Sequence, residues 1–177
     1  IKSVSSFNCC SLDIFAAKHD MKQVYISDLV EYRLSHEKLV EEISNVNKKF
    51  FSTDVIQKEF KDHVGNIHTA IIFGEIKEVT PIKFHTITSD INLFLNDEKL
   101  HSMLKTINFL QAKGGVLIFL SDEMRNKESQ KDYGIGAQIL NCLNIKQIKL
   151  MTSGGKHSFV GLQGFGLKIV EEIQIEC

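Results

Sequence analysis

An unbroken apolar run from Val116 to Leu120 (VLIFL) constrains the fold of this chain more than any other feature. A strand that is apolar at every position is typically covered on both faces, as in the parallel sheets of α/β proteins. The pattern then predicts a helix from Asp132, as its N-cap, to about Cys142, a buried strand over 147–151 and a last strand over 167–175. We therefore expect an α/β fold with a mixed, largely parallel sheet, flanked by helices and joined by right-handed crossovers.

Two more strands and an amphipathic helix are predicted ahead of this run. Residues 68–76 (HTAIIFGEI) form a β-rich run, and residues 82–88 (IKFHTIT) alternate apolar and polar. The only proline, Pro81, precedes the second strand, where its missing N–H does least harm. Apolar residues at three- and four-residue steps predict a helix over 97–112, which a Gly-Gly pair ends.

The N-terminal part of the chain has a helical pattern over residues 11–44, interrupted by a short extended piece from Gln23 to Ile26. Ser27 and Asp28 are typical N-cap residues for a second helix, whose apolar steps continue to Ile43. This pattern predicts a helical appendage in front of the α/β domain.

Residues 45–66 are polar and mixed, with edge strands expected around Phe50 and Val55. We therefore divide the chain into a helical segment over 1–44 and an α/β domain over 45–177.

The composition is that of an ordinary globular protein, with 43% apolar and 24% charged residues. A net charge of −1 argues against a nucleic-acid partner, and no apolar run approaches the roughly 20 residues that cross a bilayer. The chain starts Ile1-Lys-Ser-Val, without Met or an apolar signal-peptide core, so we expect its natural start to lie upstream. Its four cysteines (Cys9, Cys10, Cys142 and Cys177) form no C-x-x-C motif, which favours reduced thiols and a cytoplasmic location.

Five short motifs follow one another along the second part of the chain. They are Gly65-Asn-Ile-His68, Gly74-Glu-Ile76, Pro81-Ile-Lys-Phe-His85-Thr86, Gly114-Gly-Val-Leu-Ile-Phe119 and Asp132-Tyr-Gly-Ile-Gly-Ala-Gln-Ile-Leu140. In this order they resemble GTP cyclohydrolase II, the zinc enzyme family that opens GTP at the start of riboflavin synthesis. Upstream, Leu12-Asp-Ile-Phe-Ala-Ala-Lys-His19 and the stretch from Ile26 to Leu39 resemble the C-terminal tail of 3,4-dihydroxy-2-butanone 4-phosphate synthase. The two enzymes are often fused in that order, so the resemblance implies a fused upstream synthase domain as partner.

The resemblance also implies a zinc site, because zinc lowers the pKa of its bound water to about 7 and so supplies the nucleophile that ring opening needs. The family binds zinc through three cysteines, and their positions fall at Thr88 and near Asn96 and Glu98. Residues 85–101 contain no cysteine, so we expect no zinc or other cofactor. A substitute set of His85, Asp97 and His101 follows no known ligand spacing, and we interpret these as a sheet histidine and a surface helix pair.

Two further elements of the family are altered. The Arg-rich segment that handles guanine and triphosphate is replaced by Ser121 to Gln130, a stretch that we interpret as a charged, solvated loop. The family's Asp-x-Arg pair, its proton acceptor and nucleophile, aligns with Ser129 and Lys131. Serine cannot act as a carboxylate base, and lysine lacks the planar guanidinium. The sequence therefore offers no catalytic residue for the family's reaction.

Three residues remain as candidates for nucleotide binding. Thr152 and Lys156 lie where the family has a nucleotide-contacting turn, which here reads Thr-Ser-Gly-Gly-Lys, and His85 matches the family's Val-His-Ser. Backbone N–H groups of a Gly-rich turn with a lysine bind phosphate, although the same letters also suit an ordinary turn. Gly134-Ile-Gly136 we interpret as a packing feature rather than a dinucleotide motif.

Three functions compete on these observations. The first is a catalytically inactive GTP cyclohydrolase II-like domain of a riboflavin-biosynthesis protein, with a structural, oligomerising or regulatory role. The second is a nucleotide-binding or nucleotide-hydrolysing enzyme that uses Thr152 and Lys156. The third is an interaction module unrelated to nucleotides. A homodimer and weak GTP binding are further partners that the first function leaves open.

Overall fold

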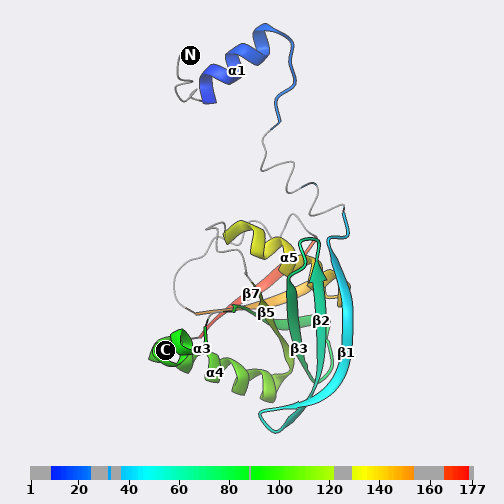
Figure 1. Cartoon of the computed structure of the whole chain (residues 1–177), viewed down its shortest axis with the longest axis vertical. Coiled ribbons are helices and arrows are strands. Elements are labelled where there is room, and N and C mark those ends of the chain that lie inside the picture. The colour runs from blue at the N-terminus through cyan, green and yellow to red at the C-terminus, as the bar shows by residue number, and fades with distance from the viewer. Residues whose placement is uncertain are drawn as a thin grey trace.

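The computed structural model describes residues 9–24, 32, 37–87, 89–121, 129–153 and 166–175 (Figure 1). These residues form a seven-stranded sheet in the order β1-β2-β3-β5-β4-β6-β7. The strands are β1 Val40–Phe50, β2 Thr53–Asp62, β3 Ile67–Phe73, β4 Val79–Thr86, β5 Gly115–Leu120, β6 Gln147–Thr152 and β7 Lys168–Gln174. The helices are α1 Cys9–Lys18, α3 Asp90–Phe94, α4 Asp97–Lys113 and α5 Ser129–Cys142.

The sheet has an antiparallel half and a parallel half. β1, β2, β3 and β5 pair antiparallel to one another in turn, whereas β4 lies parallel to both β5 and β6, and β6 lies parallel to β7. The expectation of a mixed α/β sheet is confirmed, but the parallel part is smaller than "largely parallel" implies. The difference comes from the polar stretch after residue 44, which forms long hairpin strands rather than short edge pieces.

The predicted second helix is wrong at its C-terminal end. Val40 and Ile43 lie in β1, not in a helix, because residues 40–50 pair with β2 along their whole length. Val40 is buried at 1% exposure in the core beneath α5, and ladder bonds plus this burial outweigh the local helical spacing. The rest of that predicted helix, apart from Tyr32, lies outside the described residues before residue 37. The division of the chain at residue 44 stays a prediction.

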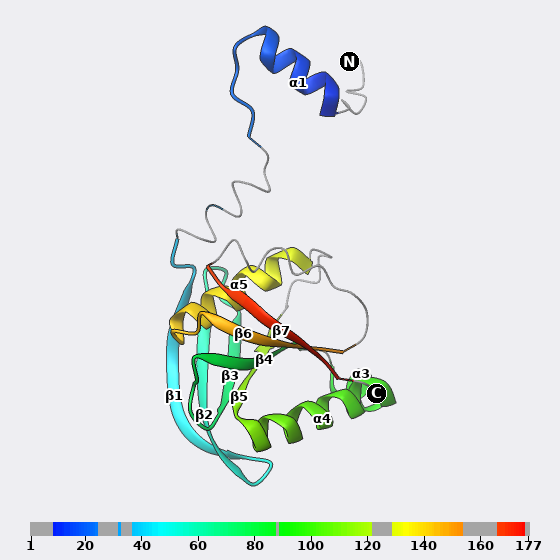
Figure 2. The ribbon, with the colours of Figure 1, turned by 180° about the vertical axis from the view of Figure 1, so that it is seen from behind.

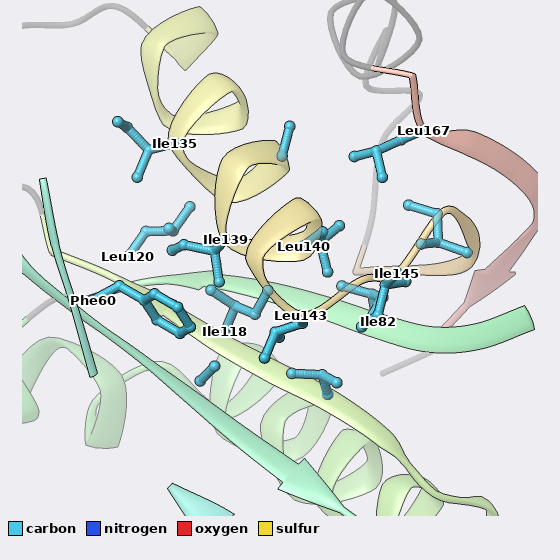
Figure 3. Close-up of a cluster of buried hydrophobic side chains, with 14 of the residues drawn as sticks. Phe60, Ile82, Ile118, Leu120, Ile135, Ile139, Leu140, Leu143, Ile145 and Leu167 are labelled. Carbon is cyan, nitrogen blue, oxygen red and sulfur yellow. The ribbon is translucent and has the colours of Figure 1, made fainter. Parts of the chain in front are cut away.

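Each face of the sheet carries its own hydrophobic core. On one face α5 covers β5 through Val116, Ile118 and Leu120 (Figure 3). On the other face α4 covers it through Leu117 and Phe119. Val116, Leu117 and Ile118 are fully buried, so the prediction that this strand is covered on both faces is confirmed. Figures 1 and 2 show the two helices on opposite sides of the sheet.

The helices confirm most of the sequence pattern. α4 runs over Asp97–Lys113 and buries Met103, Ile107 and Leu110, as its apolar spacing predicted. α5 begins at Ser129, three residues before the predicted N-cap, because the Gln and Lys that follow Ser129 are good helix formers and extend the helix backward. α1 is helical as expected, and its Ile14 and Phe15 are exposed. Within the described residues no helix is long and apolar enough to span a bilayer.

A buried amide ties α5 to the chain that leads into β1. The Gln138 side chain is 7% exposed; its Oε1 accepts from Leu39 N at 2.8 Å, and its Nε2 donates to Glu37 O at 2.9 Å. The two hydrogen bonds satisfy the N–H of Leu39 and the C=O of Glu37, just before β1, in the way that the backbone of a neighbouring strand would. They fix the path of the chain at the entry to the sheet.

Candidate functional site

The carboxyl ends of β4, β5 and β6 meet at one edge of the sheet, because these strands are parallel and in register. In open α/β sheets ligands bind beyond this edge. His85 lies near the end of β4 and Thr152 at the end of β6, so both predicted residues reach the expected edge. The side chain of Lys156 lies outside the described residues, as do those of Ser129 and Lys131, although the latter two belong to the α5 backbone.

His85 and Thr152 nevertheless point to opposite faces. Phe84 and Leu150 pack into the core on the α5 face. Because side chains alternate along a strand, His85 lies on the α4 face and Thr152 on the α5 face. The sheet therefore separates these two candidates, and they do not form one pocket.

His85 lies in a cationic and partly buried environment. Its ring meets Phe119 edge to face, with centroids 5.5 Å apart and planes at 78°. Burial lowers the pKa of His85, and the positive charges of Lys83 and Lys99 lower that pKa further. Each cause disfavours the imidazolium, so His85 is held as a neutral imidazole at physiological pH.

Lys83 is a site residue that the sequence analysis missed. It is only 7% exposed, and its Nζ donates to Ser153 Oγ at 3.0 Å, which joins β4 to the end of β6. The signal was present, because Lys83 and His85 alternate with Ile82 and Phe84 and therefore share a face. Lys83 and Lys99 together form a positive patch beside the neutral His85 on the α4 face, and this patch suits an anion.

The segment where the resemblance places zinc ligands has a different structural role here. Asn96 is the N-cap of α4, and its Oδ1 accepts from Lys99 N at 2.9 Å. His101 turns back onto its own helix, where Nδ1 donates to Asp97 O at 2.9 Å. Thr88 lies outside the described residues. Among the residues that the structure describes, no three His, Cys, Asp or Glu side chains gather as metal ligands.

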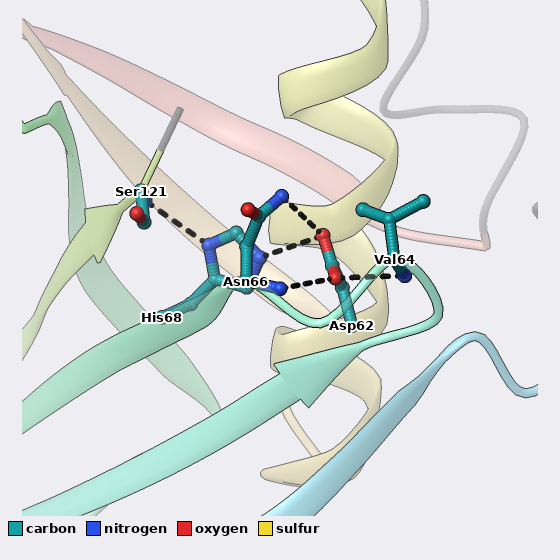
Figure 4. A network of polar contacts seen from close by, with 5 residues as sticks. All are labelled: Asp62, Val64, Asn66, His68 and Ser121. Atoms are coloured by element: carbon teal, nitrogen blue, oxygen red, sulfur yellow. Dashed lines mark hydrogen bonds and ion pairs between the residues drawn. The ribbon is translucent and has the colours of Figure 1, made fainter. Parts of the chain in front are cut away.

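A second polar cluster, also missed from the sequence, lies where the chain leaves β5 (Figure 4). The Asp62 carboxylate accepts from Val64 N at 3.0 Å, from Asn66 N at 2.8 Å and from Asn66 Nδ2 at 2.9 Å. It also faces His68 Nε2 at 3.4 Å, while His68 Nδ1 accepts from Ser121 N at 3.1 Å. Because Nδ1 accepts from Ser121 N, the hydrogen bond between Nε2 and Asp62 is donated by Nε2.

The cluster fixes the protonation state of Asp62. Burial alone would raise the pKa of Asp62, but hydrogen bonds from Asn66, His68 and Val64 outweigh it and hold that pKa below its usual range. The charged carboxylate thus ties the β2–β3 turn to the end of β5. We assign the cluster a structural role: it positions Ser121, where the expected charged loop begins.

Close packing explains one of the glycines. A Cβ on Gly136 would lie 2.6 Å from Phe84 Cε1, so only glycine lets α5 approach β4 at this point. This contact confirms the interpretation of the Gly-x-Gly as a packing feature at that position. A hollow of about 520 Å³ lies elsewhere, beside Lys48, Asp54 and Gly74 near the amino end of β5, and no predicted site residue lines it.

Comparison with known proteins identifies the class of this domain. Residues 122–174 match the family model described as GTP cyclohydrolase II. The chain is 40% identical over 164 residues to the 3,4-dihydroxy-2-butanone 4-phosphate synthase of Sulfurospirillum multivorans, and it is 29% identical to riboflavin biosynthesis protein RibBA of Aquifex aeolicus. These alignments cover 93% and 92% of this chain but only 46% and 48% of the relatives.

A solved structure agrees with these relatives. The chain matches RibBX, a two-domain 3,4-dihydroxy-2-butanone 4-phosphate synthase from A. baumannii, with a TM-score of 0.69 and 27% identity, covering 94% of this chain and 49% of that one. The resemblance seen in the sequence is confirmed over residues 122–174, which match the GTP cyclohydrolase II family. More particularly, the chain is similar to proteins named for riboflavin biosynthesis and for 3,4-dihydroxy-2-butanone 4-phosphate synthase, one of them described as two-domain, and it spans about half the length of each.

Proposed function

We propose that this domain does not open GTP and instead has a structural, oligomerising or regulatory role in a riboflavin-biosynthesis protein. The proposal rests on the sequence of the segment in which the GTP cyclohydrolase II family binds zinc. No cysteine occurs between residues 11 and 141, and Asn96, near a position where the family has a thiolate, caps α4. A neutral amide that already accepts a hydrogen bond from a helix N–H does not replace a zinc thiolate.

The names of the relatives support the same proposal. Those from Sulfurospirillum multivorans, Campylobacter jejuni and Wolinella succinogenes are named for the synthase alone, although they align with 89–93% of this chain. If the relatives are named only for their synthase, the domain that this chain matches has no activity of its own in their names. Such a domain is suited to a structural or regulatory role. The upstream partner that we propose is accordingly a 3,4-dihydroxy-2-butanone 4-phosphate synthase domain.

A turnover assay tests the loss of chemistry. The purified chain is incubated with GTP, magnesium and added zinc, and both pyrophosphate and the ring-opened pyrimidine are followed. A GTP cyclohydrolase II with its three cysteines serves as the positive control. We expect no product; ring-opened product from this chain would overturn the proposal.

Nucleotide binding without turnover is the second candidate, and the positive patch on the α4 face favours it. A bound triphosphate would neutralise Lys83 and Lys99 and would stabilise the folded state by RT ln(1 + [L]/Kd). GTP should raise the melting temperature if it binds. If the site is the patch on the α4 face, Lys83→Met should abolish the increase; if the site is at Thr152 on the α5 face, Thr152→Val should abolish it instead. The two variants thereby separate the newly found patch from the predicted Thr152 and Lys156 site.

A further inference from the structure

β1 forms one end of the sheet and pairs only with β2 in the part of the chain that the structure describes. It is 11 residues long, and Figure 1 shows it along the outside of the sheet. A long edge strand presents unpaired N–H and C=O groups that can pair with another strand. The side chains along this edge then decide which strand that can be.

The charges of β1 are ordered by sign. Glu41 and Glu42 lie at its N-terminal end, and Lys48 and Lys49 lie at its C-terminal end. All four are exposed, and the strand also exposes Ile43 at 47%. An edge with charges of one sign would repel a second copy of itself, whereas this edge is self-complementary when turned around.

A β-bulge places each acid on the same face as a base. Glu41 lies opposite Lys61 and Lys48 opposite Val55, and Lys61 and Val55 share a face because they are six residues apart in β2. In a regular strand, residues 41 and 48 would point to opposite faces, since they are seven apart. The register shift between Glu42 and Ser44 restores the match, and it does so for Glu42 and Lys49 as well.

We propose that β1 pairs antiparallel with β1 of a second copy of this chain, about a two-fold axis near Asn45. A two-fold axis perpendicular to the sheet keeps the α4 face of both copies on the same side, so Glu41 of each copy meets Lys48 of the other. Glu42 contributes less, because Lys58 of its own chain already contacts its carboxylate at 3.0 Å. The Glu41–Lys48 pair therefore selects the partner strand.

This inference deepens the oligomerising role proposed above and rests on it for its purpose. The two fail separately. GTP turnover would overturn the loss of catalysis without changing the oligomer, and a monomeric chain would overturn the β1 dimer without bearing on turnover.

Charge reversal at one pair tests the dimer. Sedimentation velocity at low salt should give the wild-type chain a mass twice its 20.1 kDa. Glu41→Lys and Lys48→Glu should each raise the dimer Kd about tenfold, because each variant places like charges opposite one another twice. An equimolar mixture of the two variants should restore the dimer as a heterodimer, and the double variant should restore the homodimer.

The matched controls lie on the opposite edge strand. Lys168→Glu and Glu172→Lys reverse exposed charges on β7 and should leave the Kd unchanged. Far-UV circular dichroism of every variant verifies the fold. A wild-type monomer at the highest concentration studied would overturn the proposal. A dimer that responds to neither β1 reversal would do the same, and it would direct attention to the exposed apolar residues of α1.

Discussion

Gly115 is the position at which one added methyl group should damage this fold most. Its φ of +140° is a conformation that side chains rarely adopt, and a Cβ there would overlap the Pro81 carbonyl oxygen and lie 2.6 Å from Leu110 Cδ2. Backbone strain of this kind costs about 1–3 kcal/mol, and overpacking adds about 1–3 kcal/mol. We therefore expect Gly115→Ala to lower the free energy of unfolding by about 4 kcal/mol.

The matched control is Gly74→Ala. Gly74 also has a positive φ, +66°, but a Cβ there meets no atom within 4 Å, so only the backbone cost of about 1–2 kcal/mol applies. Urea unfolding followed by circular dichroism measures both variants, with wild-type m-values as the test that the transition is unchanged. In thermal melts, 4 kcal/mol corresponds to about 8–16 °C for a chain of this size.

The difference between the two variants is the decisive quantity. The carbonyl of Pro81 belongs to β4, and it cannot move without disturbing the parallel pairing of β4 with β5. If Gly115→Ala costs no more than Gly74→Ala, the backbone of β4 does not approach Gly115 as closely as the structure places it.

Three more predictions follow from the polar contacts. Because the pKa of Asp62 is lowered in the folded state, its contribution to stability is present above the unfolded pKa of about 3.9 and is lost as pH falls through the folded value; Asp62→Asn should flatten the acid limb of a stability–pH profile. Lys83→Met should raise the pKa of His85 in an NMR titration, with an unchanged value counting against their proximity. Gln138→Leu should speed amide hydrogen exchange at Leu39, whereas exchange at the wild-type rate would mean that the clamp is not what protects this amide.

The sequence predicted the central strands of the sheet well, because the apolar residues within each strand are enough to indicate that it is buried. Val116–Leu120 is an unbroken apolar run, and residues 147–151 place Ile148 and Leu150 two apart; both segments are too short for a typical helix, which favours strands. β1 was missed in part because Leu39, Val40 and Ile43 have helical spacing, and only the long-range ladder to β2 decides against it.

The candidate site was less accessible to sequence reasoning. His85 and Thr152 were found by resemblance, but which face each occupies depends on the strand registers, which no local pattern contains. The Lys83–Ser153 and His68–Ser121 hydrogen bonds join residues 70 and 53 positions apart. Such pairs become visible only once the strand order is known.

The seven-stranded sheet also separates two hydrophobic cores that are packed independently of each other. Side chains on the α4 face and on the α5 face touch different neighbours, so changes made on opposite sides should have additive effects on stability. Asn96 and Glu98, near which the resemblance places two zinc ligands, cap and begin α4 and so lie on the α4 side of the sheet. Substitutions on the α4 side can therefore change the chemistry of that face. The packing of the α5 face, with its Gly136 contact and the Gln138 hydrogen bonds to residues 37–39, should stay unchanged.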